Sequence, residues 1–102
     1  MNVGRWDPER DGPLSERALQ GKLEALGYRV QRWVYPPGTR FPEHTHDVDK
    51  IDAVVSGHFR VTLADGGAVL GPGEWIEVPR GAVHSAEVVG EEPVVSLDAI
   101  RR

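Results

Sequence analysis

The apolar residues in the first third of the chain recur at the spacing of an α-helix. In the segment "LSERALQGKLEALGY", Leu19, Leu23 and Leu26 stand at positions i, i+4 and i+7, which places them on one side of a helix. Ser15 can cap the start of this helix, and Gly27 suits the position after its last turn. We therefore predict one short helix whose leucine stripe covers one face of a sheet.

From residue 28 onward the alternation of apolar and polar residues changes to a period of two, the period of a β-strand. The segment "YRVQRWVY" alternates in this way, and "PPG" ends it with a turn. The later β-rich segments are separated by Ser-Gly, Asp-Gly, Gly-Pro-Gly and Pro-Arg-Gly. Seven or eight short strands at this spacing predict an all-β fold, a sandwich or small barrel. Residues 1–13 show no periodicity, so we expect an irregular N-terminal arm followed by one domain over residues 14–102.

Length, charge and composition narrow the classes of function. The 102 residues are enough for one domain with one core. A net charge of −4 gives no basic field that would attract nucleic acid. No apolar run approaches the roughly 20 residues that cross a bilayer, and the N-terminus lacks the apolar core of a signal peptide. We therefore expect a cytoplasmic protein with neither nucleic acid nor membrane as a partner.

Histidine provides the candidate chemistry, because the chain has no cysteine and any metal must be held by nitrogen and oxygen. His44 and His46 are one residue apart in a segment that reads as extended, so their imidazoles should leave the same face of a strand. His84 follows a predicted tight turn at Pro79 and Gly81, and a returning strand can bring it opposite this pair. His58 directly follows a glycine, and we interpret it as an exposed turn residue.

Two segments resemble the motifs of the cupin superfamily. The first is "GTRFPEHTHDVDKIDAVVSG", residues 38–57, which has the cupin spacing of glycine, His-x-His, a fourth ligand position and glycine. The second is "GEWIEVPRGAVHSAEV", residues 73–88, with the spacing of glycine, proline, glycine and histidine. From the first residue of the first motif to the last residue of the second, they span residues 38–88, about half of the chain, and both spacings match without a gap. The sequence departs from the pattern at Lys50, where cupins have a glutamate, and at Val88, where they have an asparagine.

The resemblance implies an antiparallel jelly-roll β-barrel with a divalent metal inside its open end. Carried over by position, His44, His46 and His84 are the implied metal ligands, with Fe, Mn, Ni or Zn as the candidate ions. The resemblance also implies a homodimer, as do the open sheet edges of so small a β fold.

Lys50 leaves several arrangements open. Three imidazoles alone can hold a divalent ion and leave positions for water or substrate, which is the arrangement we favour. Asp52 has the same strand parity as Lys50 and can supply an oxygen ligand, although we expect it to pair with Lys50; Glu77 is another candidate partner of this lysine. Alternatively no metal binds, and Lys50 anchors an anionic ligand or acts as an acid or base.

The residues therefore predict two functions of different classes. The first is a metal-dependent enzyme acting on a small polar organic substrate, with a dioxygenase-like oxidoreductase as the leading reaction class and an isomerase as another. The second is a non-catalytic module that binds a small anionic ligand through Lys50 without metal. In either case we expect Lys50, Asp52, Trp75 and Glu77 to line the pocket, with Lys50 as the candidate catalytic residue.

Overall fold

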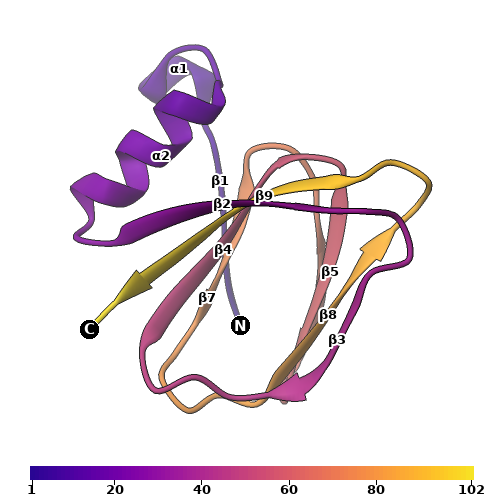
Figure 1. Cartoon of the computed structure of the whole chain (residues 1–102). Coiled ribbons are helices and arrows are strands. Elements are labelled where there is room, and N and C mark those ends of the chain that lie inside the picture. Colours follow the sequence, from indigo (N-terminus) through magenta and orange to yellow (C-terminus); the bar gives the residue numbers. More distant parts are fainter.

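The structure, a computed structural model that describes residues 1–102, consists of nine strands and two helices (Figure 1). In chain order the elements are β1 (Asn2–Arg5), α1 (Pro8–Asp11), α2 (Glu16–Ala25), β2 (Arg29–Tyr35), β3 (Arg40–His44), β4 (Asp49–Ser56), β5 (His58–Leu63), β6 (Gly66–Leu70), β7 (Glu74–Val78), β8 (His84–Val89) and β9 (Val94–Arg101).

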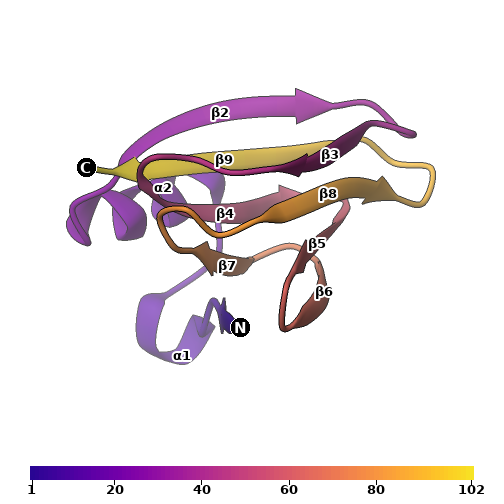
Figure 2. The same ribbon diagram turned by 90° about the horizontal axis from the view of Figure 1, so that it is seen from below.

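The strands form two antiparallel sheets that face each other. The five-stranded sheet has the order β1-β7-β4-β9-β2, and the four-stranded sheet has the order β3-β8-β5-β6. Seen from below, β2 lies at one side of the molecule and β6 at the other (Figure 2). The all-β antiparallel prediction of jelly-roll type is confirmed, with nine strands in place of seven or eight.

The predicted helix is present as α2, on the outer side of the five-stranded sheet (Figure 1). The Ser15 side chain accepts a hydrogen bond from the backbone N–H of Ala18, as a capping serine does. Leu19 and Leu23 are buried completely or nearly so, whereas Leu26, the third residue of the stripe, is exposed. The helix ends at Ala25, so Leu26 has already left the helical face.

Residues 1–13 are not the irregular arm that we expected. Asn2–Arg5 form β1, which pairs with β7, and Pro8–Asp11 form α1, capped by the Asp7 side chain. Trp6 lies between them and is buried against the outer face of the sheet. The strand is short and rich in polar residues, so its pairing with β7 rather than local propensity accounts for it.

The central strand β4 is buried on both faces, which explains its unbroken run of buried residues. Ile51 and Ala53 face outward and pack in the core beneath α2. Val54 belongs to the second core, between the two sheets, and Lys50 and Asp52 share its parity. The inner face of β4 therefore carries a lysine and an aspartate into the space between the sheets.

Three connections lie together at one end of the sandwich. They are the segment after β3, the β5–β6 hairpin and the turn between β7 and β8. Leu63 at the end of β5 pairs with His84 at the start of β8, and the N–H of Gly81 in the β7–β8 turn donates to the carbonyl of His46. This end of the sandwich holds His44, His46 and His84. None of the helices has both the length and the apolar character needed to span a bilayer.

Candidate metal centre

The structure brings His44, His46 and His84 together. One ring nitrogen from each lies within 4.8 Å of the others. The ring centroids of His44 and His84 are 4.2 Å apart, those of His44 and His46 are 4.8 Å apart, and those of His46 and His84 are 5.1 Å apart. The three imidazoles can therefore converge on one ion.

In two of the imidazole rings, a backbone carbonyl determines which ring nitrogen is available to bind a metal. The Nδ1 of His44 lies 2.7 Å from the carbonyl oxygen of Pro42, and the Nδ1 of His84 lies 2.9 Å from that of Ala82. Each Nδ1 must therefore carry the proton and donate it, which leaves a lone pair on Nε2. Metal-binding histidines are commonly oriented by such a hydrogen bond from the other ring nitrogen.

The donor set fits a divalent first-row metal. The Nε2 atoms of His46 and His84 are buried and have no hydrogen-bond partner. Buried polar atoms without a partner are uncommon in folded proteins and require an explanation. Burial is the largest of the influences that lower the pKa of both side chains, which favours the neutral form that can bind a metal.

The route by which His46 reaches the site differs from the expected one. His44 is the last residue of β3 and pairs with His84 on β8, whereas His46 lies beyond the strand, in the connection to β4. The strand parity of the His-x-His pair is therefore not what aligns the rings. The hydrogen bond from Gly81 to His46 holds the connection against the β7–β8 turn instead.

Lys50 is buried, with 8% of its surface exposed, and forms ion pairs with two carboxylates. Its Nζ lies 3.3 Å from Asp52 Oδ1 and 2.6 Å from Asp98 Oδ1. The contact with Asp52 is one that the sequence predicts, whereas the contact with Glu77 is absent. We call Lys50, Asp52 and Asp98 the ion cluster.

The members of the ion cluster shift one another's pKa. Burial alone would lower the pKa of Lys50, but the attraction of Asp52 and Asp98 outweighs burial and raises it. Burial is also the largest influence on Asp52 and, with the repulsion of Asp98, raises its pKa to about 6 against the opposing attraction of Lys50. Lys50 therefore remains an ammonium at neutral pH, which argues against its use as a base.

The histidines and the ion cluster line one cavity of about 160 Å³. Its remaining wall is mostly aromatic, with Tyr35 stacked on Phe59 at 5.6 Å and in edge contact with Phe41 at 4.9 Å. Burial and the nearby carboxylates raise the pKa of Tyr35 to about 12, so its hydroxyl stays protonated. The cavity thus combines three imidazoles, a phenol and an apolar surface.

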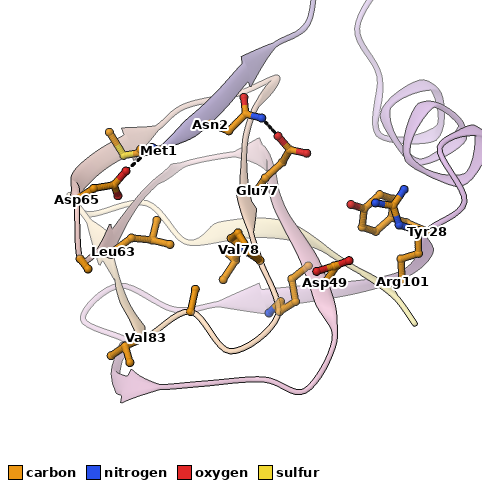
Figure 3. Close-up of a pocket in the computed structure, with 14 residues that line it drawn as sticks. Met1, Asn2, Tyr28, Asp49, Leu63, Asp65, Glu77, Val78, Val83 and Arg101 are labelled. Carbon is orange, nitrogen blue, oxygen red and sulfur yellow. Dashed lines mark hydrogen bonds and ion pairs between the residues drawn. The ribbon is translucent and has the colours of Figure 1, made fainter.

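Trp75 and Glu77 do not line this cavity, contrary to our expectation. Trp75 packs in the outer core, and its indole lies over Gly4, where an added Cβ would come within 2.2 Å of the ring. The Glu77 side chain accepts a hydrogen bond from Asn2 and lies in a different, wider hollow of about 580 Å³ (Figure 3). Both side chains point to the outer face of β7, and Lys50 is the residue that the two hollows share.

Asp98 and the aromatic residues Tyr35 and Phe59 were missed by sequence reasoning. A signal for Asp98 exists in "VVSLDAI", where Ser96 and Asp98 are polar residues at alternate positions of an otherwise apolar strand. Asp98 pairs directly with Asp52 on β4, so both face the same side of the sheet. His58 is exposed at the start of β5 and is not part of the histidine group.

Known structures share this fold. The DMSP lyase DddQ from Ruegeria pomeroyi superimposes with a TM-score of 0.67 at 22% identity, over 74% of this chain and 38% of that protein. Bacillus subtilis oxalate decarboxylase, a protein with Mn(II) centres, superimposes with a TM-score of 0.64 at 24% identity, over 71% of this chain and 21% of that protein. KdgF from Halomonas sp. superimposes with a TM-score of 0.60 at 22% identity, over 74% of this chain and 87% of that protein. At these identities the similarity establishes the fold alone, and the chain spans well under half the length of the first two proteins.

The sequence comparisons identify the family. No curated protein matches the chain significantly. The model of the cupin domain matches residues 31–100, which include both motifs and every residue of the cavity. The chain belongs to the cupin domain family.

Proposed function

We propose that this protein is a metal-dependent cupin enzyme in which His44, His46 and His84 hold a divalent ion and a small polar organic substrate occupies the adjoining cavity. The observation that supports it most directly is the pair of buried, unpartnered Nε2 atoms on His46 and His84. Fe, Mn, Ni and Zn are the candidate ions; imidazole ligands suit Fe, Ni and Zn in particular. A dioxygenase-like oxidoreductase is the leading reaction class, with dioxygen as the oxidant.

The bound metal would supply Lewis acidity and, if it is redox-active, electrons for dioxygen chemistry. The residues of the chain itself would bind and orient the substrate. Tyr35 can donate a hydrogen bond from its protonated hydroxyl to a polar substrate group. Phe41 and Phe59 would exclude water from the apolar part of the substrate. A cavity of about 160 Å³ suits a small molecule.

The alternative function, a metal-free module in which Lys50 anchors an anion, has less support. Two carboxylates already surround the Lys50 ammonium, at 2.6 and 3.3 Å. The ion cluster has one positive and two negative formal charges, so it would repel an anionic ligand rather than attract it.

The first test is elemental analysis of the protein after incubation with Fe(II), Mn(II), Ni(II) and Zn(II) and removal of unbound metal. We expect close to one ion per chain for at least one metal, and loss of that ion in His84→Ala and His44→Ala. His58→Ala is the matched control, because His58 is exposed and outside the group, and it should retain the metal. Circular dichroism would establish that the variants are folded.

An empty wild-type protein would refute the proposal, as would full metal content in both ligand variants. If the protein binds metal, oxygen consumption with a panel of small polar organic compounds tests the reaction class. Turnover without oxygen uptake would exclude the dioxygenase and leave the isomerase.

A further inference from the structure

The ion cluster has a composition that the stability of the fold does not explain. Asp52 on β4 and Asp98 on β9 are directly opposite each other in the register of the sheet. Like charges in this position destabilise a pair of strands. One lysine stands between them, so two carboxylates share a single buried cation. The ion cluster keeps a formal charge of −1 that no residue of the cavity neutralises.

The cavity around the ion cluster contains no other charged side chain. Its remaining titratable residues are the three histidines and Tyr35, and all four are uncharged in a metal-bearing site, since imidazoles bind metals in their neutral form. The unbalanced negative charge therefore faces the same small space as the three convergent imidazoles. A buried charge without a counter-charge is unfavourable, and a dication in that space would supply one.

Lys50 occupies the fourth ligand position of the first motif, where a carboxylate would bind the metal directly. We propose that the ion cluster replaces that carboxylate electrostatically: Asp52 and Asp98 supply one net negative charge to the metal through space, and Lys50 keeps their oxygens from binding it. This inference rests on the proposed metal site and adds the role of three residues that are not ligands.

The geometry supports both parts of this role. Both ion pairs of the lysine are made through the Oδ1 atoms, at salt-bridge distance, so each carboxylate is held on the ammonium. A dication with the ion cluster has the same formal charge of +1 as a dication with one glutamate ligand. It differs in having one more coordination position free for substrate.

Metal affinity in a set of charge variants tests the inference. Affinity for Zn(II) and Mn(II) would be measured at pH 8 by competition with a chromogenic chelator. Asp98→Asn leaves a neutral Lys50–Asp52 pair, so we expect the affinity to fall about 10- to 100-fold, the range found when residues around metal ligands are changed. Lys50→Met combined with Asp98→Asn restores the charge of −1 and releases Asp52 from the ammonium, so we expect its affinity to recover to at least about a third of the wild-type value. Glu92→Gln, an exposed change elsewhere, is the control for total charge.

The double variant separates the electrostatic role from a structural one. If Lys50 and Asp98 served only to hold the strands together, removing both would weaken metal binding at least as much as removing Asp98 alone. Failure of the double variant to recover, or wild-type affinity in Asp98→Asn, would overturn the inference while the metal site stands. If the wild type binds no metal but Lys50→Glu does, Lys50 opposes metal binding, and both the inference and the proposed function fail.

Discussion

At the scale of the residue, a single buried lysine between two aspartates determines the net charge of the cavity. Spacing along the chain is enough to predict the three histidines, which follow from motif positions, and the contact of Lys50 with Asp52, which follows from strand parity. Asp98 comes from β9, and only the register between β4 and β9 places it opposite Asp52. The motif does not reveal which parity of β7 faces inward: Ile76 and Val78 lie in the core between the sheets, whereas Trp75 packs in the outer core and Glu77 shares its parity.

The raised pKa of Asp52 predicts a pH-dependent contribution to stability. Because the pKa of Asp52 is about 6 in the folded protein, against its ordinary value of 3.8, folding favours the protonated carboxyl. This stabilisation is fully present below pH 3.8 and is lost as the pH rises through 6, by up to about 3 kcal/mol. The side chain at this position in Asp52→Asn stays neutral at every pH. We therefore expect the difference in free energy of unfolding, wild type minus Asp52→Asn, to decrease from pH 4 to pH 8.

Urea denaturation of both proteins at each pH is the appropriate measurement. The comparison must be made against the variant, because His46 and His84 have lowered pKa values and act in the opposite direction, losing stability as the pH falls. Glu92→Gln, an exposed change, should follow the wild type at every pH. Parallel curves for wild type and Asp52→Asn would contradict the prediction.

At the scale of the element, some helices and strands follow from the local sequence pattern, whereas others depend on pairing with a distant strand. The helix α2 and the glycine-containing turns between the strands can be predicted because their causes are local. Gly57, which ends the first motif, has a φ of +80°, and an added Cβ would lie 2.3 Å from the Pro93 carbonyl oxygen. In contrast, β1 could not be predicted, because its four residues gain their strand conformation from pairing with β7.

Leu19 in α2 and Leu26, which directly follows the helix, offer a direct test of how the helix is attached. Leu19 is fully buried in the core between α2 and the five-stranded sheet, whereas Leu26 is about half exposed. Leu19→Ala should therefore lower the free energy of unfolding by about 2 to 5 kcal/mol, through lost burial and the cavity left behind. Leu26→Ala is the matched control and should change it by no more than about 0.5 kcal/mol. Equal losses in chemical denaturation would show that the helix is not seated as described.

At the scale of the whole molecule, the two sheets leave strand edges open, and β2 is the longest edge strand. It pairs only with β9, so one row of its backbone N–H and C=O groups has no partner strand. Trp33 and Val34 on this strand are both nearly half exposed. Unpaired edges with exposed apolar side chains favour association with another chain.

The homodimer that we predict from the sequence should therefore form through β2. We expect sedimentation velocity at tens of micromolar to give a species of twice the 11.2 kDa chain mass. Trp33→Glu combined with Val34→Lys should shift it to the monomer, because burying two charges at an apolar contact is unfavourable. Val69→Lys changes a residue of similar exposure on β6, the edge of the other sheet, and should leave the dimer intact. A monomeric wild type would refute the homodimer, and dissociation by Val69→Lys alone would move the interface to the four-stranded sheet.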